Sequence, residues 1–166
     1  SNLCKKFGIK SHFFSSNINA LVNQVGHSRD HFEPLTLACS NHGERYKAAD
    51  YVAAVALIHR TARQHGSFFS RYDLFVTPTL ANEPLPLGEI SMQHDDWGCY
   101  LNRLLDEIPF TPLFNATGCP AVSIPLETGP TGLPVGIHIG AAFGREQLLL
   151  SVSAALEAQW PWHKRR

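Results

Sequence analysis

The sequence predicts a mixed α/β layer fold with about three strands flanked by helices. Two short apolar segments, 121–125 and 135–139, lie on either side of a glycine- and proline-containing turn at 129–132. This pattern is typical of two strands joined by a tight connection. A third apolar segment, 72–77, ends at a proline, and segments with helical spacing precede and follow the strands. Helices in such positions cover the faces of a sheet, so a layered fold follows.

The size and charge of the chain fit an ordinary globular protein. Its 166 residues include 44% hydrophobic and 17% charged residues, which suits one domain with its own core. Fourteen basic residues balance fourteen acidic ones. Because there is no basic excess to neutralise phosphates, we expect no nucleic-acid partner.

The location of the protein is expected to be cytoplasmic. No apolar run approaches the ~20 residues of a membrane span, and no signal-peptide pattern is present, so no membrane partner is expected. The four cysteines, Cys4, Cys39, Cys99 and Cys119, are interpreted as reduced thiols, because a chain of this size does not need disulfides to build a core.

The first 43 residues show weak periodicity. Residues 19–25 predict one or two helical turns, and a second short helix is expected to start at Pro34, because proline is favourable in a first helical turn. We expect this segment, 1–43, to pack with 44–166 as one domain.

The clearest helix begins near residue 50. Tyr51, Val55 and Ile58 share one face at spacings of three and four residues. Gly66 allows two interpretations, because it either caps this helix or lies inside a helix that continues to Arg71 at a cost of about 1 kcal/mol.

The next elements are a strand, a loop and a helix. The strand at 72–77 is expected to end at Pro78, and the prolines and glycine of 79–90 indicate a loop. A helix is expected over 95–106, and Pro109 stops it.

The last elements are the strand pair and a final helix. Pro125 is expected to end the strand that begins at residue 121. In 135–139, apolar residues alternate with Gly136 and His138, as in a strand with one buried face. The spacing of leucines and valine over 146–158 predicts a helix.

From about residue 48 onward, the order of these segments resembles the C-terminal region of amidase-signature hydrolases. The matching segments are 49–54, 69–79, 110–125 (FTPLFNATGCPAVSIP), 132–140 and 143–149. Each segment alone is a weak signal, and their common order makes the resemblance specific. It implies that the strands are a fragment of the mixed sheet of that family.

The resemblance also implies amide hydrolysis in the complete enzyme. The family uses a serine nucleophile, a second serine and a lysine, with backbone N–H groups as an oxyanion hole. Its two serines lie in a Gly-Ser-rich loop before the region matched here. This sequence has no Gly-Gly pair, its only adjacent serines are Ser15 and Ser16, and no lysine has a matching context. We therefore expect the C-terminal part of an amidase, without catalytic residues and inactive alone.

Candidate substrate-pocket residues follow from the resemblance as well, because loops after the C-terminal strands help to wall the pocket in that family. The candidates are Thr77, Thr79, Asn115, Thr117 and Gly118. The alternative interpretation is that these side chains bond neighbouring backbone in turns, as Thr and Asn often do.

No cofactor and no metal are expected. Cys39 and His42 have ligand-like spacing, and 94–96 offers three donors, but zinc needs three or four converging ligands. Cys119 is not expected to be a nucleophile, because Pro120 has no N–H to donate to an oxyanion.

The expected partners are a small-molecule amide in the complete enzyme and the missing N-terminal catalytic segment. A sheet separated from that segment exposes an edge and an apolar face, which predicts self-association, as a dimer. The only methionine is Met92, so we interpret the chain as a piece of a longer protein. The alternative is a stand-alone, non-catalytic binding or interaction protein derived from an amidase.

Overall fold

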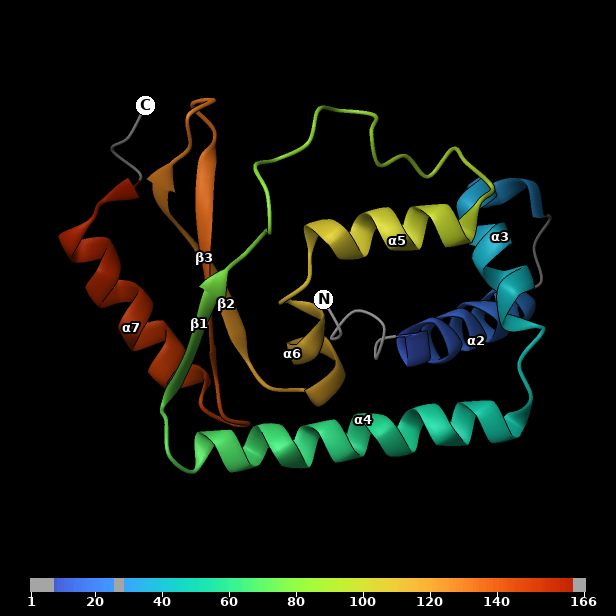
Figure 1. Ribbon diagram of the computed structural model, residues 1–166, viewed down its shortest axis with the longest axis horizontal. Coiled ribbons are helices and arrows are strands. Elements are labelled where there is room, and N and C mark those ends of the chain that lie inside the picture. Colours follow the sequence, from blue (N-terminus) through green and yellow to red (C-terminus); the bar gives the residue numbers. More distant parts are fainter. Residues whose placement is uncertain (1–7, 26–28, 163–166) are drawn as a thin grey trace. The chain divides into compact units, whose positions relative to one another are not determined.

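The computed structural model describes residues 8–25 and 29–162 (Figure 1). The elements, in chain order, are α2 (Gly8–Val25), the 3-10 helix η1 (Arg29–His31), α3 (Pro34–Gly43), α4 (Ala48–Phe69), β1 (Leu74–Pro78), α5 (Trp97–Glu107), α6 (Pro112–Thr117), β2 (Ala121–Thr128), β3 (Pro134–Ala141) and α7 (Glu146–Gln159). The predicted α/β fold with about three strands and flanking helices is confirmed.

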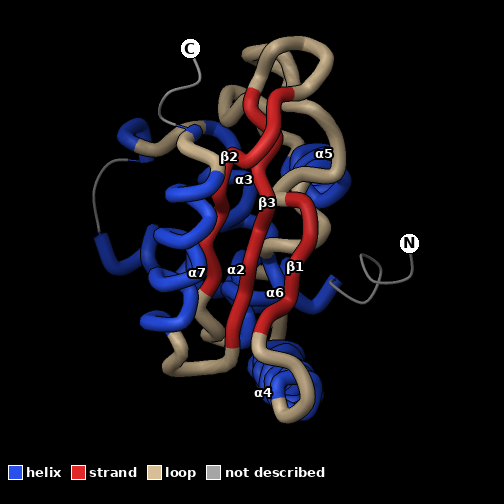
Figure 2. Tube along the Cα trace, turned by 90° about the vertical axis from the view of Figure 1, so that its left-hand side faces the viewer, coloured by secondary structure: helices blue, strands red, loops and turns tan. Residues whose placement is uncertain are grey.

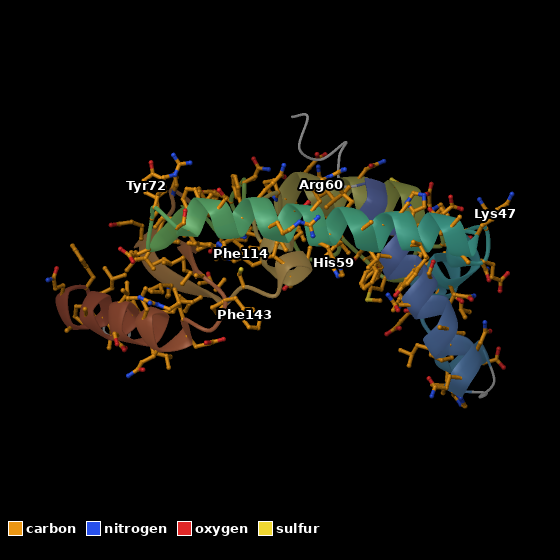
Figure 3. The ribbon with its side chains drawn as sticks, turned by 90° about the horizontal axis from the view of Figure 1, so that it is seen from below. Lys47, His59, Arg60, Tyr72, Phe114 and Phe143 are labelled. Atoms are coloured by element: carbon orange, nitrogen blue, oxygen red, sulfur yellow. The ribbon has the colours of Figure 1, made fainter. Side chains whose placement is uncertain are left out.

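The chain divides into two compact units. Unit 1 consists of Ser1–Ile58 and Leu85–Asp106, and unit 2 consists of His59–Pro84 and Glu107–Arg166. Helix α4 begins in unit 1 and ends in unit 2, and Figure 3 shows it between Lys47 and Tyr72, with His59 and Arg60 along its length. The packing of 1–43 with 44–166 as one domain stays a prediction.

Helix α2 of unit 1 is longer than the one or two turns expected at 19–25. Its buried positions include Ser11 and Ser15 as well as Val22, so the packed face carries hydroxyls at helical spacing rather than an apolar stripe. Small side chains let α2 approach α3 closely: a Cβ atom added to Gly43 would collide with the Ser15 carbonyl group. Hydrophobic periodicity does not detect such a face.

The core of unit 1 forms around Trp97 at the start of α5. Trp97 packs with Leu35 and Cys39 of α3, and its indole nitrogen donates to the Ser11 hydroxyl over 3.5 Å. The predicted helix at 95–106 is confirmed, two residues later at its start and one at its end.

Unit 2 contains the sheet, whose strand order is β1-β3-β2 with both pairs antiparallel (Figure 2). The expected strand at 135–139 forms the centre of the sheet. One sheet face packs on α7 through Ile124, Ile139 and Leu149, because alternate residues of a strand point to the same face.

Two elements of unit 2, β2 and α6, differ from the expectation. Strand β2 passes through Pro125 to Thr128, with a shift of register between Pro125 and Glu127. Proline is tolerated there because β2 is an edge strand and the irregularity removes a ladder bond that proline cannot donate. The short helix α6 was not predicted because six residues are too few for periodicity. Helix α4 continues through Gly66 to Phe69, which agrees with the second interpretation of Gly66 and ends two residues earlier than that interpretation gave.

No described helix is long and apolar enough to cross a lipid bilayer.

Candidate functional site

A row of polar side chains crosses the sheet of unit 2 on the face opposite α7. His138 of β3 is directly opposite Thr77 of β1 on one side and Ser123 of β2 on the other. Side chains of directly opposite residues lie on the same face. The predicted candidate Thr77 is therefore part of a polar row to which all three strands contribute.

Thr79 extends this row beyond the end of β1. Its hydroxyl is 2.6 Å from the Ser123 hydroxyl, and its N–H donates to the Gly136 carbonyl over 2.8 Å. A Cβ atom at Gly136 would lie 2.6 Å from Thr79 Oγ1 and 2.9 Å from Ser123 Oγ. The hydroxyl pair can therefore form only because position 136 has no side chain.

Phe114 of α6 covers the neighbouring part of the same face. It is 3% exposed, and its ring centroid is 4.8 Å from His138, 5.0 Å from His65 and 5.9 Å from Phe75. A Cβ atom at Gly140 would collide with this ring. In Figure 3, Phe114 lies next to α4.

Three buried polar atoms on this face make no hydrogen bond within the part of the chain that the structure describes. They are His65 Nε2, Thr77 Oγ1 and His138 Nδ1. Buried polar atoms nearly always have a partner. These atoms therefore mark the face as one that suits a further hydrogen-bonding group.

The predicted residues on and after α6 have different surroundings. The Thr117 hydroxyl donates to the Leu113 carbonyl over 3.0 Å and lies 3.5 Å from His65 Nδ1. Gly118 ends the helix at φ 73°, and its N–H donates to the Phe114 carbonyl. Asn115 is exposed. The structure thus joins Thr77 and Thr79 in one row and links Thr117 to His65, and the role of all five candidates in a substrate pocket stays a prediction.

Sequence reasoning did not propose His65, Ser123 or His138. The alternation of Gly136 and His138 with apolar residues was a signal, because it placed His138 on the face away from the core. His65 gave no such signal, since its partner Thr117 lies 52 residues away and only the packing of α4 brings them together.

The side chains of this face can donate and accept hydrogen bonds. Burial lowers the pKa of both His65 and His138, so the imidazoles are neutral at pH 7 and offer one donor and one acceptor each. The Ser123 hydroxyl bonds another hydroxyl, which is not a general base. In residues 8–25 and 29–162, no group of three or more His, Cys, Asp or Glu is placed to hold a metal ion.

Unit 2 is an α/β layer in which α7 covers one face of the sheet and hydrogen-bonding side chains lie on the opposite face. Comparison with known proteins specifies its family. Residues 4–150 match the model of the family described as Amidase. The chain belongs to the amidase family.

Its relatives are considerably longer. The AmiC protein of Mycobacterium leprae is 36% identical over 134 residues, which make up 81% of this chain and 28% of AmiC. The 6-aminohexanoate-cyclic-dimer hydrolase of Paenarthrobacter ureafaciens is 36% identical over 100 residues, 57% of this chain and 20% of the hydrolase. A solved structure of 6-aminohexanoate cyclic dimer hydrolase superposes with a TM-score of 0.81 at 27% identity, covering 92% of this chain and 34% of that one. The chain thus spans 28% of the length of AmiC.

The two buried histidines predict that unit 2 loses stability in acid. Their folded-state pKa lies below the ordinary value of 6.5 because burial disfavours the imidazolium. Below pH 6.5 the unfolded chain therefore binds more protons than the folded chain. The contribution of the neutral histidines to the free energy of unfolding is fully present above pH 6.5, and it is lost as the pH falls toward their folded-state pKa. The slope reaches up to about 1.4 kcal/mol per pH unit for each histidine.

Urea unfolding between pH 7.5 and pH 4.5 checks this expectation. In the double variant His65→Gln/His138→Gln, the free energy of unfolding should fall less with decreasing pH than in the parent chain. In the exposed control His59→Gln, it should fall as in the parent chain. An unchanged fall in the double variant would contradict the role of the two histidines.

Proposed function

We propose that this chain is the C-terminal part of a hydrolase that cleaves C–N amide bonds of small molecules by a Ser-Ser-Lys mechanism when complete. The observation that carries the proposal is the family match over residues 4–150 in a chain that spans only 28% of a relative. We further propose that the chain lacks the catalytic residues, because its sequence contains no Gly-Ser-rich loop.

The surroundings of Ser15 support this second point. Ser15 lies inside α2 and is 0% exposed. The thiol of Cys39 lies 3.5 Å from its hydroxyl and donates to it, and its backbone packs against Gly43. Backbone N–H groups inside a helix bond to helix carbonyls, so they are not free to stabilise an oxyanion. Ser15 is therefore a packing residue in this proposal.

The polar row is the part of the chain that we assign to the substrate. An amide presents a carbonyl acceptor and, when secondary, an N–H donor. The Thr77 hydroxyl can donate to the carbonyl, and an unprotonated nitrogen of His138 can accept from the N–H. Such matching bonds fix the orientation of a substrate, while the nucleophile comes from the missing catalytic segment.

Labelling with a serine-directed fluorophosphonate tests whether the nucleophile lies outside this chain. The intact mass of the isolated chain should not change, because no serine in it is activated. When the chain is co-purified with the unmatched N-terminal segment of the P. ureafaciens hydrolase, an adduct should form on that segment. A stoichiometric adduct on a serine of this chain, lost after prior denaturation, would contradict the proposal.

We also propose that the isolated chain self-associates through the sheet of unit 2. Strands β1 and β2 are the edges of the described sheet, and Val76 of β1 is 59% exposed. Unpaired edges and exposed apolar side chains favour pairing with another chain. In the complete enzyme, the catalytic segment would take this place.

Light scattering at high protein concentration measures this association. The parent chain should be a dimer, and Val76→Lys should shift it toward the monomer, because a charge on an edge strand opposes pairing. Leu87→Lys is the matched control, since Leu87 is fully exposed outside the sheet. A monomeric parent chain would contradict the proposal.

The alternative proposal is a stand-alone, non-catalytic binding protein, and a pocket in unit 1, described below, favours it. It predicts ligand binding without hydrolysis in the presence of the catalytic segment. A cytoplasmic location is also proposed, and the free thiols of Cys39, Cys99 and Cys119 fit it.

A further inference from the structure

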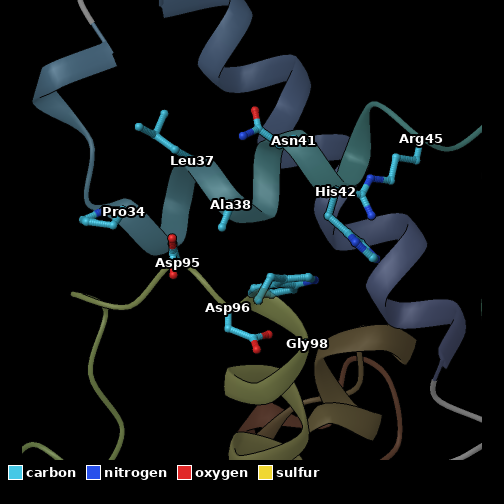
Figure 4. Close-up of a pocket in the computed structure, with 10 residues that line it drawn as sticks. Pro34, Leu37, Ala38, Asn41, His42, Arg45, Asp95, Asp96 and Gly98 are labelled. Carbon is cyan, nitrogen blue, oxygen red and sulfur yellow. The ribbon is translucent and has the colours of Figure 1, made fainter.

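Unit 1 contains a pocket of about 730 Å³ beside helix α3 (Figure 4). One stripe of that helix lines it, including Leu37 and Ala38, and Arg45 follows beyond the helix end. The segment before α5 forms the opposite wall with Asp95 and Trp97. All the lining residues belong to unit 1, so the pocket does not depend on unit 2.

An unpaired carboxylate lies at the end of the pocket where α3 begins. The Leu35 N–H donates to the Met92 carbonyl over 3.2 Å, which holds the segment before α5 against the first turn of α3. Asp96 caps α5, since its carboxylate accepts the Cys99 N–H over 2.9 Å. Asp95 is exposed and makes no hydrogen bond or ion pair within the described residues. Its charge is therefore available to a ligand.

A cation lies at the opposite end, where α3 stops. The His42 ring is not this cation, because burial, together with the charges of Arg45 and His12, lowers its pKa. His42 Nε2 is also bonded to the Tyr46 hydroxyl at 2.6 Å. The Arg45 guanidinium is exposed and forms no ion pair within the part of the chain described. Figure 4 shows Arg45 and Asp95 apart from each other.

The wall between the two charges carries apolar and polar side chains. Leu37 and Ala38 of α3 and Trp97 at the start of α5 are its apolar part, and Ala38 packs against the cluster of Trp97. Asn41 and His42 of α3 are its polar part. Helix α3 has 10 residues, so it is roughly 15 Å long at 1.5 Å per residue. Opposite charges at the two ends of such a helix are too far apart to neutralise each other, although one extended ligand can reach both.

We propose that this pocket binds an extended small zwitterion. Its ammonium group pairs with Asp95, its carboxylate pairs with Arg45, and a hydrocarbon chain long enough to span the helix lies along Leu37, Ala38 and Trp97. Guanidinium groups suit carboxylates because their planar N–H donors match the two oxygens, and an aromatic ring beside the chain favours a cationic ligand end. The proposal is independent of the hydrolytic function.

Calorimetric titration of the full chain at low salt tests the charge pattern. The probes are 8-aminooctanoate, octanoate and octylammonium, which share one hydrocarbon chain. The zwitterion should bind about threefold to tenfold more tightly than either singly charged probe, and added salt should weaken it. Equal affinity for all three probes, or no binding of the zwitterion, would overturn the proposal.

Two charge-removing variants test the orientation. Asp95→Asn should weaken 8-aminooctanoate about threefold to tenfold and leave octanoate unchanged. Arg45→Gln should weaken the zwitterion equally and leave octylammonium unchanged. The matched controls are Asp106→Asn and Arg60→Gln, which remove exposed charges outside the pocket. Equal losses in the controls would overturn the proposal, as would ligand-induced amide shifts in NMR spectra that avoid Ala38 and Gly98.

Discussion

Replacing Phe114 by alanine is expected to lower the free energy of unfolding of unit 2 by about 3–5 kcal/mol. The ring is 3% exposed and packs against His65, His138 and Phe75, and against the Cα of Gly140. Removing it leaves a cavity that the rigid centre of the sheet cannot close. It also leaves the unpaired nitrogens of both histidines in that cavity.

Urea unfolding, with hydrogen exchange of the β3 amides as the local readout, measures this loss. Phe143→Ala is the matched control, because Phe143 is 80% exposed and the same atoms are removed. Its effect should stay within about 0.5 kcal/mol. Similar losses for the two variants would show that Phe114 does not organise the polar face.

The second large effect is expected from Gly43→Ala, which should lower the stability of unit 1 by about 2–3 kcal/mol. The new methyl group would collide with the Ser15 carbonyl group, and the Asn19 Cβ would be 3.0 Å away. Backbone atoms cannot turn aside as a side chain can, so α2 and α3 must separate. That separation stretches the bonds from Asn19 Nδ2 to the Ser40 carbonyl and hydroxyl, both 3.2 Å.

Gly66→Ala is the control for the second effect, and it should have the opposite sign. A Cβ atom at Gly66 meets nothing within 4 Å, and alanine inside a helix is favoured over glycine by about 0.5–1 kcal/mol. Thermal and urea unfolding of both variants give the comparison. A stabilising Gly43→Ala would show that α2 and α3 are not closely packed.

Elements with strong periodicity were predictable from the sequence. Helices α4 and α7 carry apolar residues at helical spacing, and β3 alternates, so their positions were confirmed to within a few residues. Helix α2 was predicted only in part because it packs through Ser11 and Ser15, whose hydroxyls pair with buried groups. A polar residue on a buried face cannot be distinguished from an exposed one until its partner is known.

The candidate site was also predictable only in part. Thr77 and Thr79 were selected by resemblance, and the structure places Thr77 opposite His138 and Thr79 beside Ser123. Ser123 was missed because its neighbour across the hydroxyl pair is 44 residues distant. Register sets such pairs, and register depends on bonds between strands that are remote in sequence.

The sequence by itself determined the amidase family, the order of the strands and of the strongly periodic helices, and the lack of a Gly-Ser-rich loop. These properties are local, since each depends on residues close together in the chain. Only the tertiary structure decided that Thr77, His138 and Ser123 form one row, that His65 and His138 flank Phe114, and that Arg45 and Asp95 line one pocket. Those groupings depend on strand register and helix packing, which are set by the sum of many weak contacts across the fold rather than by any local pattern.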